Sequence, residues 1–274
     1  MSPTDINKRR EIIYSYIEKK QLKSAIENVK QLTDIQQNWS VSEKLTELET
    51  NYKFMLHYLV EGKGDPQQDK IYDKLFRDIY ILTDEAAESL LMQESSSVFY
   101  EKLRVQNVRE AVTLDDYIDI LIKHADTATF LDLLEEGEEK ATRVRKNSLA
   151  HENTLRDLFY YVFTSPLANN DFIESLNRFI DDGVIPVNDK CMIISALTLN
   201  IFERFDAAKI LFLLDVCRSP QQEIAARAII GIIPIFQIYR ERCQLYPDCG
   251  NRVKLLSDDT HFNRMFMRTI TGYI

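Results

Sequence analysis

Cysteine and histidine side chains near the end of this 274-residue sequence are the first candidates for chemistry. Cys243 and Cys249 have five residues between them and His261 follows, so they could in principle contribute to a metal site. Zinc-binding cysteines normally lie roughly two to four residues apart, and a fourth ligand is not evident. We therefore expect one cysteine at a helix end and the other in a Tyr-Pro-Asp-Cys-Gly turn, with no metal bound.

The four histidines fall in four different predicted elements, at His57, His124, His151 and His261. None belongs to the His-Glu-x-x-His pattern that places two zinc ligands on one helix face. His151 and Glu152 begin a predicted helix, where we expect such a pair to cap the helix at the surface. Catalysis needs several groups that converge, and the sequence does not indicate them here.

Two carboxylate clusters complete the candidate residues. Asp115-Asp116-x-x-Asp119 opens a predicted helix, where acidic side chains interact favourably with the helix dipole. Asp181-Asp182-Gly183 is typical of a turn, and neither cluster has the alternating acidic spacing of a calcium loop. The chain also has no glycine-rich phosphate loop and no Gly-x-Ser-x-Gly elbow. The sequence therefore predicts no catalytic, cofactor-binding or metal-binding residue, and it identifies no partner-binding residue.

Helices must position these residues, because apolar side chains recur at helical spacing and the chain has only 7 Gly and 7 Pro. We expect Thr4 or Asp5 to cap the first helix and Thr113 to cap a later one. Residues 94–112 fit a helix or a short strand equally well. The predicted apolar helix faces in the first half cover 12–17, 22–32, 45–59, 71–82 (running to Leu91 or breaking near Thr83) and 114–122. The predicted helices of the second half cover 151–163, 171–180, 188–204, 206–217, 220–242 and 259–274.

A charged stretch divides the chain into a less regular helical region (1–134), a connecting helix or flexible linker (135–150) and a repeat-like region (151–274). The helix is favoured, because Glu135, Glu138 and Glu139 can pair with Lys140, Arg143 and Lys146 at turn-related spacings. In the repeat-like region, alternate helices begin at 151, 188 and 220. Repeating helix pairs of this length are typical of an α-solenoid.

The formal net charge of -9 disfavours nonspecific binding to nucleic acid. Residues 1–150 carry 21 basic and 28 acidic side chains, so most of the acidity lies in the first half. No secretory signal follows the first methionine, and the four cysteines are expected to be free thiols in a reducing cytoplasm. The longest apolar run, Ala228–Phe236, is about half of the roughly 20 residues that a membrane span needs.

Ser219–Gly231 (SPQQEIAARAIIG) resembles the second helix of a HEAT-type repeat. That helix opens with a Pro- or Asp-bearing turn, and a β-branched residue is followed four positions later by Ala, which lets neighbouring helices approach closely. Ile224 and Ala228 occupy these places, and Asn188–Leu197 is similar in part. Ala225 stands where the family commonly has an arginine that ties adjacent turns, which puts that tie in doubt. The resemblance covers roughly residues 150–245 and implies a solenoid, mostly a scaffold and in a few members an enzyme.

Two smaller features belong to the same interpretation. Tyr14–Asp34 looks slightly like one tetratricopeptide unit, with Ala25 in the small-residue place. Pro234 lies three residues after Gly231 in the most apolar helix and is expected to kink it, either to fit its neighbours or to curve a groove wall.

The sequence predicts an all-α protein of antiparallel helix pairs, with an α-solenoid (HEAT- or tetratricopeptide-like) second half. The hydrophobic stripe is still apolar at Tyr273 and Ile274, so we expect an N-terminal piece of a longer protein. The predicted function is a non-catalytic scaffold that presents the concave surface of 151–245 to a protein partner. The alternative is an enzyme domain or subunit whose active site the sequence does not reveal, or which lies in a missing C-terminal part. A HEAT-like nucleic-acid binder is disfavoured by the charge.

Overall fold

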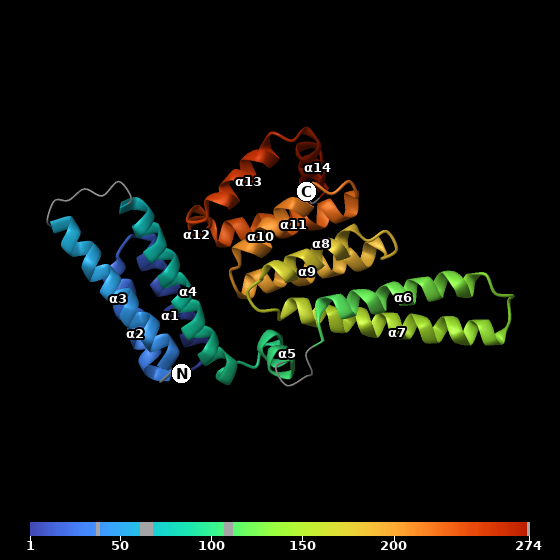
Figure 1. Cartoon of the computed structure of the whole chain (residues 1–274), viewed down its shortest axis with the longest axis horizontal. Coiled ribbons are helices and arrows are strands. Elements are labelled where there is room, and N and C mark those ends of the chain that lie inside the picture. Colours follow the sequence, from blue (N-terminus) through green and yellow to red (C-terminus); the bar gives the residue numbers. More distant parts are fainter. Residues whose placement is uncertain (37–38, 61–67, 107–111, 273–274) are drawn as a thin grey trace. The chain divides into compact units, whose positions relative to one another are not determined.

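The computed structural model describes residues 1–36, 39–60, 68–106 and 112–272. Within these residues the chain forms fourteen α-helices and no strand, which confirms the predicted all-α fold (Figure 1). The chain divides into two compact units, Met1–Glu101 and Lys102–Ile274. Helix α5 (Val98–Gln106) lies across the boundary, so the segment 94–112 that fitted a helix or a strand contains a helix from Val98 and no strand where it is described. No helix among the described residues is long and apolar enough to cross a membrane.

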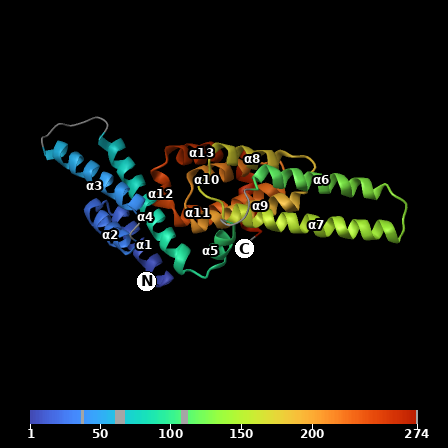
Figure 2. The same cartoon turned by 60° about the horizontal axis from the view of Figure 1, so that its bottom comes forward.

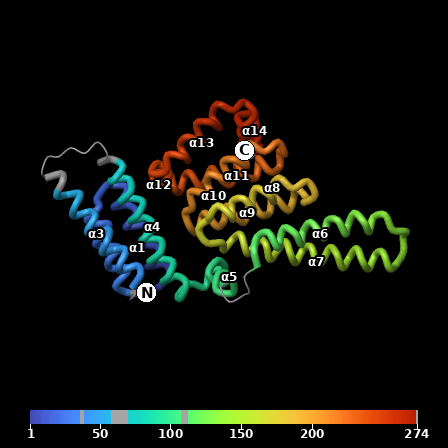
Figure 3. Tube along the Cα trace, viewed as in Figure 1, coloured from blue at the N-terminus to red at the C-terminus, as the bar shows by residue number. Residues whose placement is uncertain are grey.

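The first unit is a bundle in which helix α4 packs against three other helices. Its elements are α1 (Pro3–Glu18), α2 (Leu22–Gln36), α3 (Trp39–Val60) and α4 (Gln68–Glu94). Ile13, Val29 and Ile79 are fully or almost fully buried at the centre of this bundle. Helix α4 does not break near Thr83 but continues to Glu94, and its trace is one helix in Figure 3. The Thr83 hydroxyl donates a 2.7 Å hydrogen bond to the Ile79 carbonyl within this helix.

Helix α1 begins one turn earlier than predicted. Ser2, and neither Thr4 nor Asp5, is its N-cap: the Ser2 hydroxyl accepts from the Asp5 backbone N–H at 3.2 Å, and the Asp5 carboxylate accepts from the Ser2 backbone N–H at 3.3 Å. Pro3 favours this start, since its fixed φ suits the first helical position. Thr113 caps α6 in the same reciprocal way with Asp116, as predicted.

The second unit stacks helices in two rows. Helices α7, α9, α11 and α14 pack against one another in succession, and so do α6, α8, α10 and α13 (Figures 1 and 2). The bounds are α6 (Leu114–Asp132), α7 (Glu138–Phe163), α8 (Asn170–Asp181), α9 (Val187–Glu203), α10 (Ala207–Val216), α11 (Gln222–Ile238), α12 (Arg240–Gln244), α13 (Pro247–Ser257) and α14 (Thr260–Thr271).

Helix α7 starts at Glu138, so most of the charged stretch 135–150 is helical and lies inside the second unit. Two ion pairs form there, Lys140–Glu136 at 2.7 Å and Arg143–Glu139 at 2.6 Å. The first of these differs from the predicted pairing, because the carboxylate that reaches Lys140 is that of Glu136, on the loop four residues before it.

Two boundaries near the end of the chain also differ from the prediction. The helix predicted over 220–242 ends at Ile238, and α12 follows as a separate short helix. Helix α13 was not predicted, because Pro247 reads as a breaker in the sequence whereas it occupies the first turn of a new helix. The sequence also predicts that the third helix ends at Gly62–Pro66. That end lies outside the described residues, and so do residues 107–111 of the segment 94–112 and residues 273–274 of the apolar end.

Helices α9 and α11 approach closely at Gly231. A Cβ added at Gly231 would lie 2.4 Å from the Thr198 Oγ1 atom and 2.9 Å from Cγ2, so no larger residue fits without movement of α9. Ala225 and Ala228 are completely buried on α11, and Pro234 lies inside the same helix. Small side chains therefore set the spacing between α9 and α11.

Candidate functional site

The residues considered for metal binding lie in different environments. Cys243 and Cys249 are buried thiols, and His261 is exposed in the first turn of α14. Burial raises the pKa of Cys243 to about 12 and that of Cys249 to about 11, which keeps both thiols protonated at neutral pH. In the part of the chain that the structure describes, no three His, Cys, Asp or Glu side chains are grouped so that they could hold a metal ion.

The first carboxylate cluster joins two helices of the second unit. Asp115 and Asp119 on α6 form ion pairs with Arg178 on α8, at 2.9 Å and 2.5 Å, and the Ser175 hydroxyl donates to Asp115 at 2.9 Å. Hydrogen bonds to these carboxylates raise the pKa of Arg178, with the bond to Asp119 contributing most. These acidic residues therefore fix α6 to α8, and a catalytic role would require them to give up Arg178.

The second carboxylate cluster forms the turn that the sequence predicts. The Asp182 carboxylate accepts backbone hydrogen bonds from Val184 at 2.8 Å and Ile185 at 3.0 Å. The Asp182 carbonyl accepts a 2.5 Å bond from the buried Lys190 ammonium group, whose pKa burial lowers. This turn directs the chain from α8 into α9.

A polar cluster that the sequence does not reveal joins α6, α7 and α9. His151 Nε2 and Asp189 Oδ2 are 2.8 Å apart, with the carboxylate almost completely buried. The His124 ring lies edge-on to the His151 ring, with centroids 6.3 Å apart. Asn147 contacts His124 twice: its Oδ1 is 3.0 Å from Nδ1, and its Nδ2 donates to the His124 carbonyl at 2.9 Å.

This His–Asp pair has one requirement of acid–base catalysis and lacks another. A buried carboxylate orients the imidazole, as in hydrolases whose histidine activates a nucleophile. Asp189 is the hydrogen-bond partner of His151 among the described residues, and no serine or cysteine is hydrogen-bonded to the ring there. Burial raises the pKa of Asp189, so desolvation outweighs the attraction to His151. The cluster is best suited to holding three helices together.

The sequence interpretation placed His151 at a helix start and at the surface, and that placement was wrong. His151 lies in the second half of α7, which begins thirteen residues earlier, and its side chain is 23% exposed. No local signal reveals the cluster, because Asp189 is separated from it by 38 residues. The pairing depends on the contact between α7 and α9.

A second unpredicted cluster surrounds Lys209, which is fully buried in α10. Its ammonium group donates to the Pro166 carbonyl at 2.6 Å, to Asn200 Oδ1 at 2.7 Å and to the Ser165 hydroxyl at 2.9 Å. Asp206 Oδ2 lies 3.7 Å away, and burial lowers the pKa of Lys209 to about 8. The sequence signal that could have indicated this cluster is a lysine within the apolar run of α10. This network fixes the α7–α8 loop to α9 and α10.

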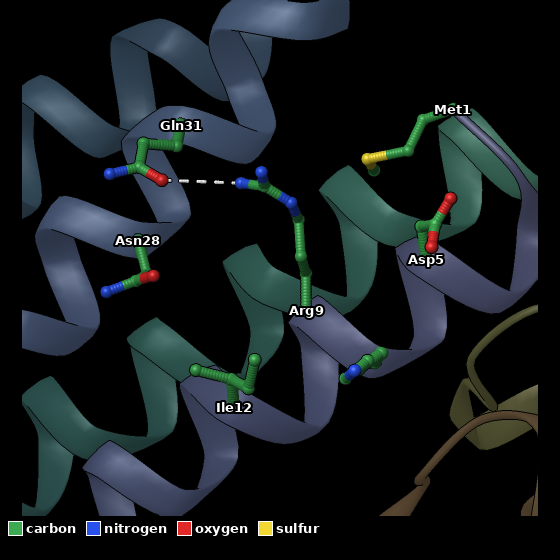
Figure 4. Close-up of a pocket in the computed structure, with 7 residues that line it drawn as sticks. Met1, Asp5, Arg9, Ile12, Asn28 and Gln31 are labelled. Atoms are coloured by element: carbon green, nitrogen blue, oxygen red, sulfur yellow. Dashed lines mark hydrogen bonds between the residues drawn. The ribbon is translucent and has the colours of Figure 1, made fainter.

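The first unit has an open pocket of about 520 Å³ between α1 and α2 (Figure 4). A 3.3 Å hydrogen bond from Arg9 Nη1 to Gln31 Oε1 crosses it, and Asp5 on its edge already caps α1. The other lining residues include Ile12 and Asn28. Asn28 donates to the Ser24 carbonyl at 2.8 Å, so the hydrogen bonds of Asp5, Arg9, Asn28 and Gln31 are structural and do not form an acid–base pair.

No family model matches this sequence, and no curated protein or solved structure matches it. The arrangement of the chain's own residues therefore carries the functional inference.

Proposed function

We propose that residues 102–274 act as a non-catalytic helical scaffold that binds a protein partner. The observation that supports this most is the two-row packing, in which α7, α9, α11 and α14 follow one another beside α6, α8, α10 and α13. Helix pairs stacked in this way are the building units of α-solenoids, which present extended surfaces to their partners. We also propose that the protein resides in a reducing compartment such as the cytoplasm, because its four cysteines are buried free thiols.

Close packing at the α9–α11 contact supports the solenoid interpretation. The HEAT-type resemblance implies a small residue where neighbouring helices approach, and Ala228 is completely buried on α11. Gly231, three residues further along α11, admits the Thr198 side chain of α9. The polar clusters also favour a scaffold: Arg178 joins α6 to α8, and the His151–Asp189 pair joins α7 to α9.

An enzyme domain is the second candidate, and the His151–Asp189 pair is the observation that favours it. A His–Asp pair orients an imidazole for proton transfer when a nucleophile or substrate reaches the other ring nitrogen. We place this function second, because the His124 ring lies edge-on to the His151 ring and, among the described residues, no serine or cysteine is hydrogen-bonded to His151.

The proposed function is tested by isolating a partner with the tagged full chain, identifying it by mass spectrometry and titrating the purified pair. Hydrogen exchange should show protection on two or more consecutive helix pairs of residues 102–274. Gly231→Ala should weaken binding because it strains the α9–α11 contact, whereas Gly250→Ala, the same change in open space on α13, should not. Protection confined to Met1–Glu101, or turnover of a substrate that His151→Gln abolishes, would contradict the scaffold.

A further inference from the structure

The antiparallel α6–α7 hairpin extends beyond the rest of the second unit (Figures 1 and 2). Its inner half packs on α8 and α9, where Ile118 and Leu121 are buried. In its outer half the packing is minimal: of residues 126–149, all of which the structure describes, Leu131 is the one buried side chain. The outer half is thus a solvent-exposed surface on two helices.

The end of the hairpin, residues 126–139, is called the hairpin tip below. Lys140 closes it: its ammonium group donates to the Leu134 carbonyl at 2.9 Å, to the Asp132 carbonyl at 3.3 Å and to Glu136 at 2.7 Å. These bonds satisfy carbonyls at the C-terminal end of α6 that the helix leaves without partners. The tip therefore has a defined backbone although it has little core.

Two large apolar side chains on the hairpin tip face solvent. Phe130 is 58% exposed and Leu133 is 81% exposed. Asp126 lies one helical turn before Phe130, on the same face of α6. Adjacent exposed apolar residues rimmed by polar ones are a common mark of a protein-binding surface.

The hairpin tip is also strongly acidic. It carries six carboxylates and no lysine or arginine. Glu136 and Glu139 are paired with Lys140 and Arg143 of α7. In the described part of the chain no ion pair reaches the other four acidic residues of the tip, which are Asp126, Asp132, Glu135 and Glu138. The apolar pair is therefore surrounded by negative charge.

We propose that the hairpin tip docks a basic amphipathic helix of a protein partner. The apolar face of such a helix covers Phe130 and Leu133, and its lysines or arginines neutralise the carboxylates around them. Polyanionic surfaces are repelled by the same carboxylates. The proposal rests on the scaffold function and adds the place and the chemistry of the partner.

The probe for this proposal is a synthetic amphipathic helix of leucine and lysine, titrated into the purified full chain by calorimetry. Binding should weaken at least tenfold in the apolar variant Phe130→Ser/Leu133→Ser. It should weaken by a similar factor in the charge variant Asp126→Asn/Asp132→Asn/Glu135→Gln. Added salt should weaken it as well, since the attraction is between exposed charges.

The control variant, Glu11→Gln/Glu18→Gln/Glu43→Gln, removes the same charge from exposed positions in the first unit. Its affinity for the peptide should stay within about twofold of the unmodified chain. Hydrogen exchange with the peptide bound should show protection on 126–145. Circular dichroism of each variant establishes that it is folded before its affinity is compared.

Three results would overturn the proposal. Equal weakening in the control variant would mean a general attraction between opposite charges, and absence of saturable binding at low salt would mean no docking site. Self-association that the apolar variant abolishes, seen by sedimentation, would assign the tip to a second copy of the chain. If a natural partner binds the tip variants as tightly as it binds the unmodified chain, this inference alone is refuted. The scaffold function is refuted only if the contacts of that partner avoid the second unit.

Discussion

Replacing Lys209 by methionine should remove a defined pH dependence from the stability of the second unit. Methionine fills a similar volume, but Asn200 Oδ1 and the Pro166 carbonyl lose their donor. Each buried acceptor left unpaired costs about 1–3 kcal/mol, and relief of the buried charge offsets part of this. We expect Lys209→Met to lower the free energy of unfolding by roughly 1–3 kcal/mol at neutral pH.

The pH dependence follows from the pKa of Lys209, which folding lowers from 10.5 to about 8. The stability that this lysine contributes is therefore complete above its unfolded pKa and is lost as the pH falls through about 8. The shift corresponds to about 3 kcal/mol over the whole range. Between about pH 7 and pH 9, the unmodified chain should gain about 1.3 kcal/mol relative to Lys209→Met.

The comparison with the variant is necessary because the buried thiols act in the opposite direction. Burial raises the pKa of Cys217 and Cys243 to about 12 and that of Cys249 to about 11. Their contribution to stability is complete below the unfolded pKa of 9.0 and is lost as the pH rises from there. These losses are the same in both proteins, so the difference between them isolates Lys209.

The measurement is urea unfolding followed by far-ultraviolet circular dichroism, with hydrogen exchange to assign the transition of the second unit. Fluorescence of Trp39, the single tryptophan, would report on the first unit instead. Lys254→Met, at an exposed position on α13, is the matched control and should show no pH-dependent difference. If the difference for Lys209→Met stays constant from about pH 7 to pH 9, the lowered pKa is refuted.

Three further predictions test separate features of the structure. Gly231→Ala should lower the stability of the second unit by roughly 1–3 kcal/mol in urea unfolding, because its Cβ would lie 2.4 Å from Thr198 Oγ1. Thr198→Ala should restore most of that loss in the double variant, and strictly additive losses would contradict the clash. Lys20→Gly should raise the stability of the first unit by roughly 0.5–1 kcal/mol in thermal melts, because Lys20 has φ 57°; an unchanged melting temperature would count against this. Asp189→Asn should lower the free energy of unfolding by roughly 1–2 kcal/mol less than His151→Ala does at neutral pH. The reason is that burial raises the pKa of Asp189, so the contribution of its carboxyl group to stability is complete below the unfolded pKa and is lost as the pH rises. The reverse order would refute the desolvation argument.

Local features of this protein were predictable from the sequence. Thr113 and Asp116 form the cap of α6, and Asp182 forms the turn before α9, because each interaction joins residues two or three positions apart. Helix α13 was not predicted for a local reason as well: a proline that begins a helix cannot be told in the sequence from one that ends a helix, and Pro247 begins α13.

The polar clusters were not predictable, because they depend on which helices become neighbours. Lys209 meets Ser165 across 44 positions of the chain, and His151 meets Asp189 across 38. The hairpin tip was only half visible: its six carboxylates are evident in the sequence, but Phe130 and Leu133 occur at helical spacings that equally suit a buried face. They are exposed because the described helices of the second unit leave the outer half of α6 and α7 uncovered.

The hairpin is anchored near its inner end, and a partner bound at the tip would act on its outer end, so the hairpin can work as a lever. His151 holds its inner part to α9 through Asp189, and Glu138 lies about 20 Å from His151 along α7 at 1.5 Å per residue. A rotation of about 5° at that fulcrum therefore moves the tip by about 2 Å. A force applied at the tip acts with the same leverage on the contact between α7 and α9, which contains the His151–Asp189 pair.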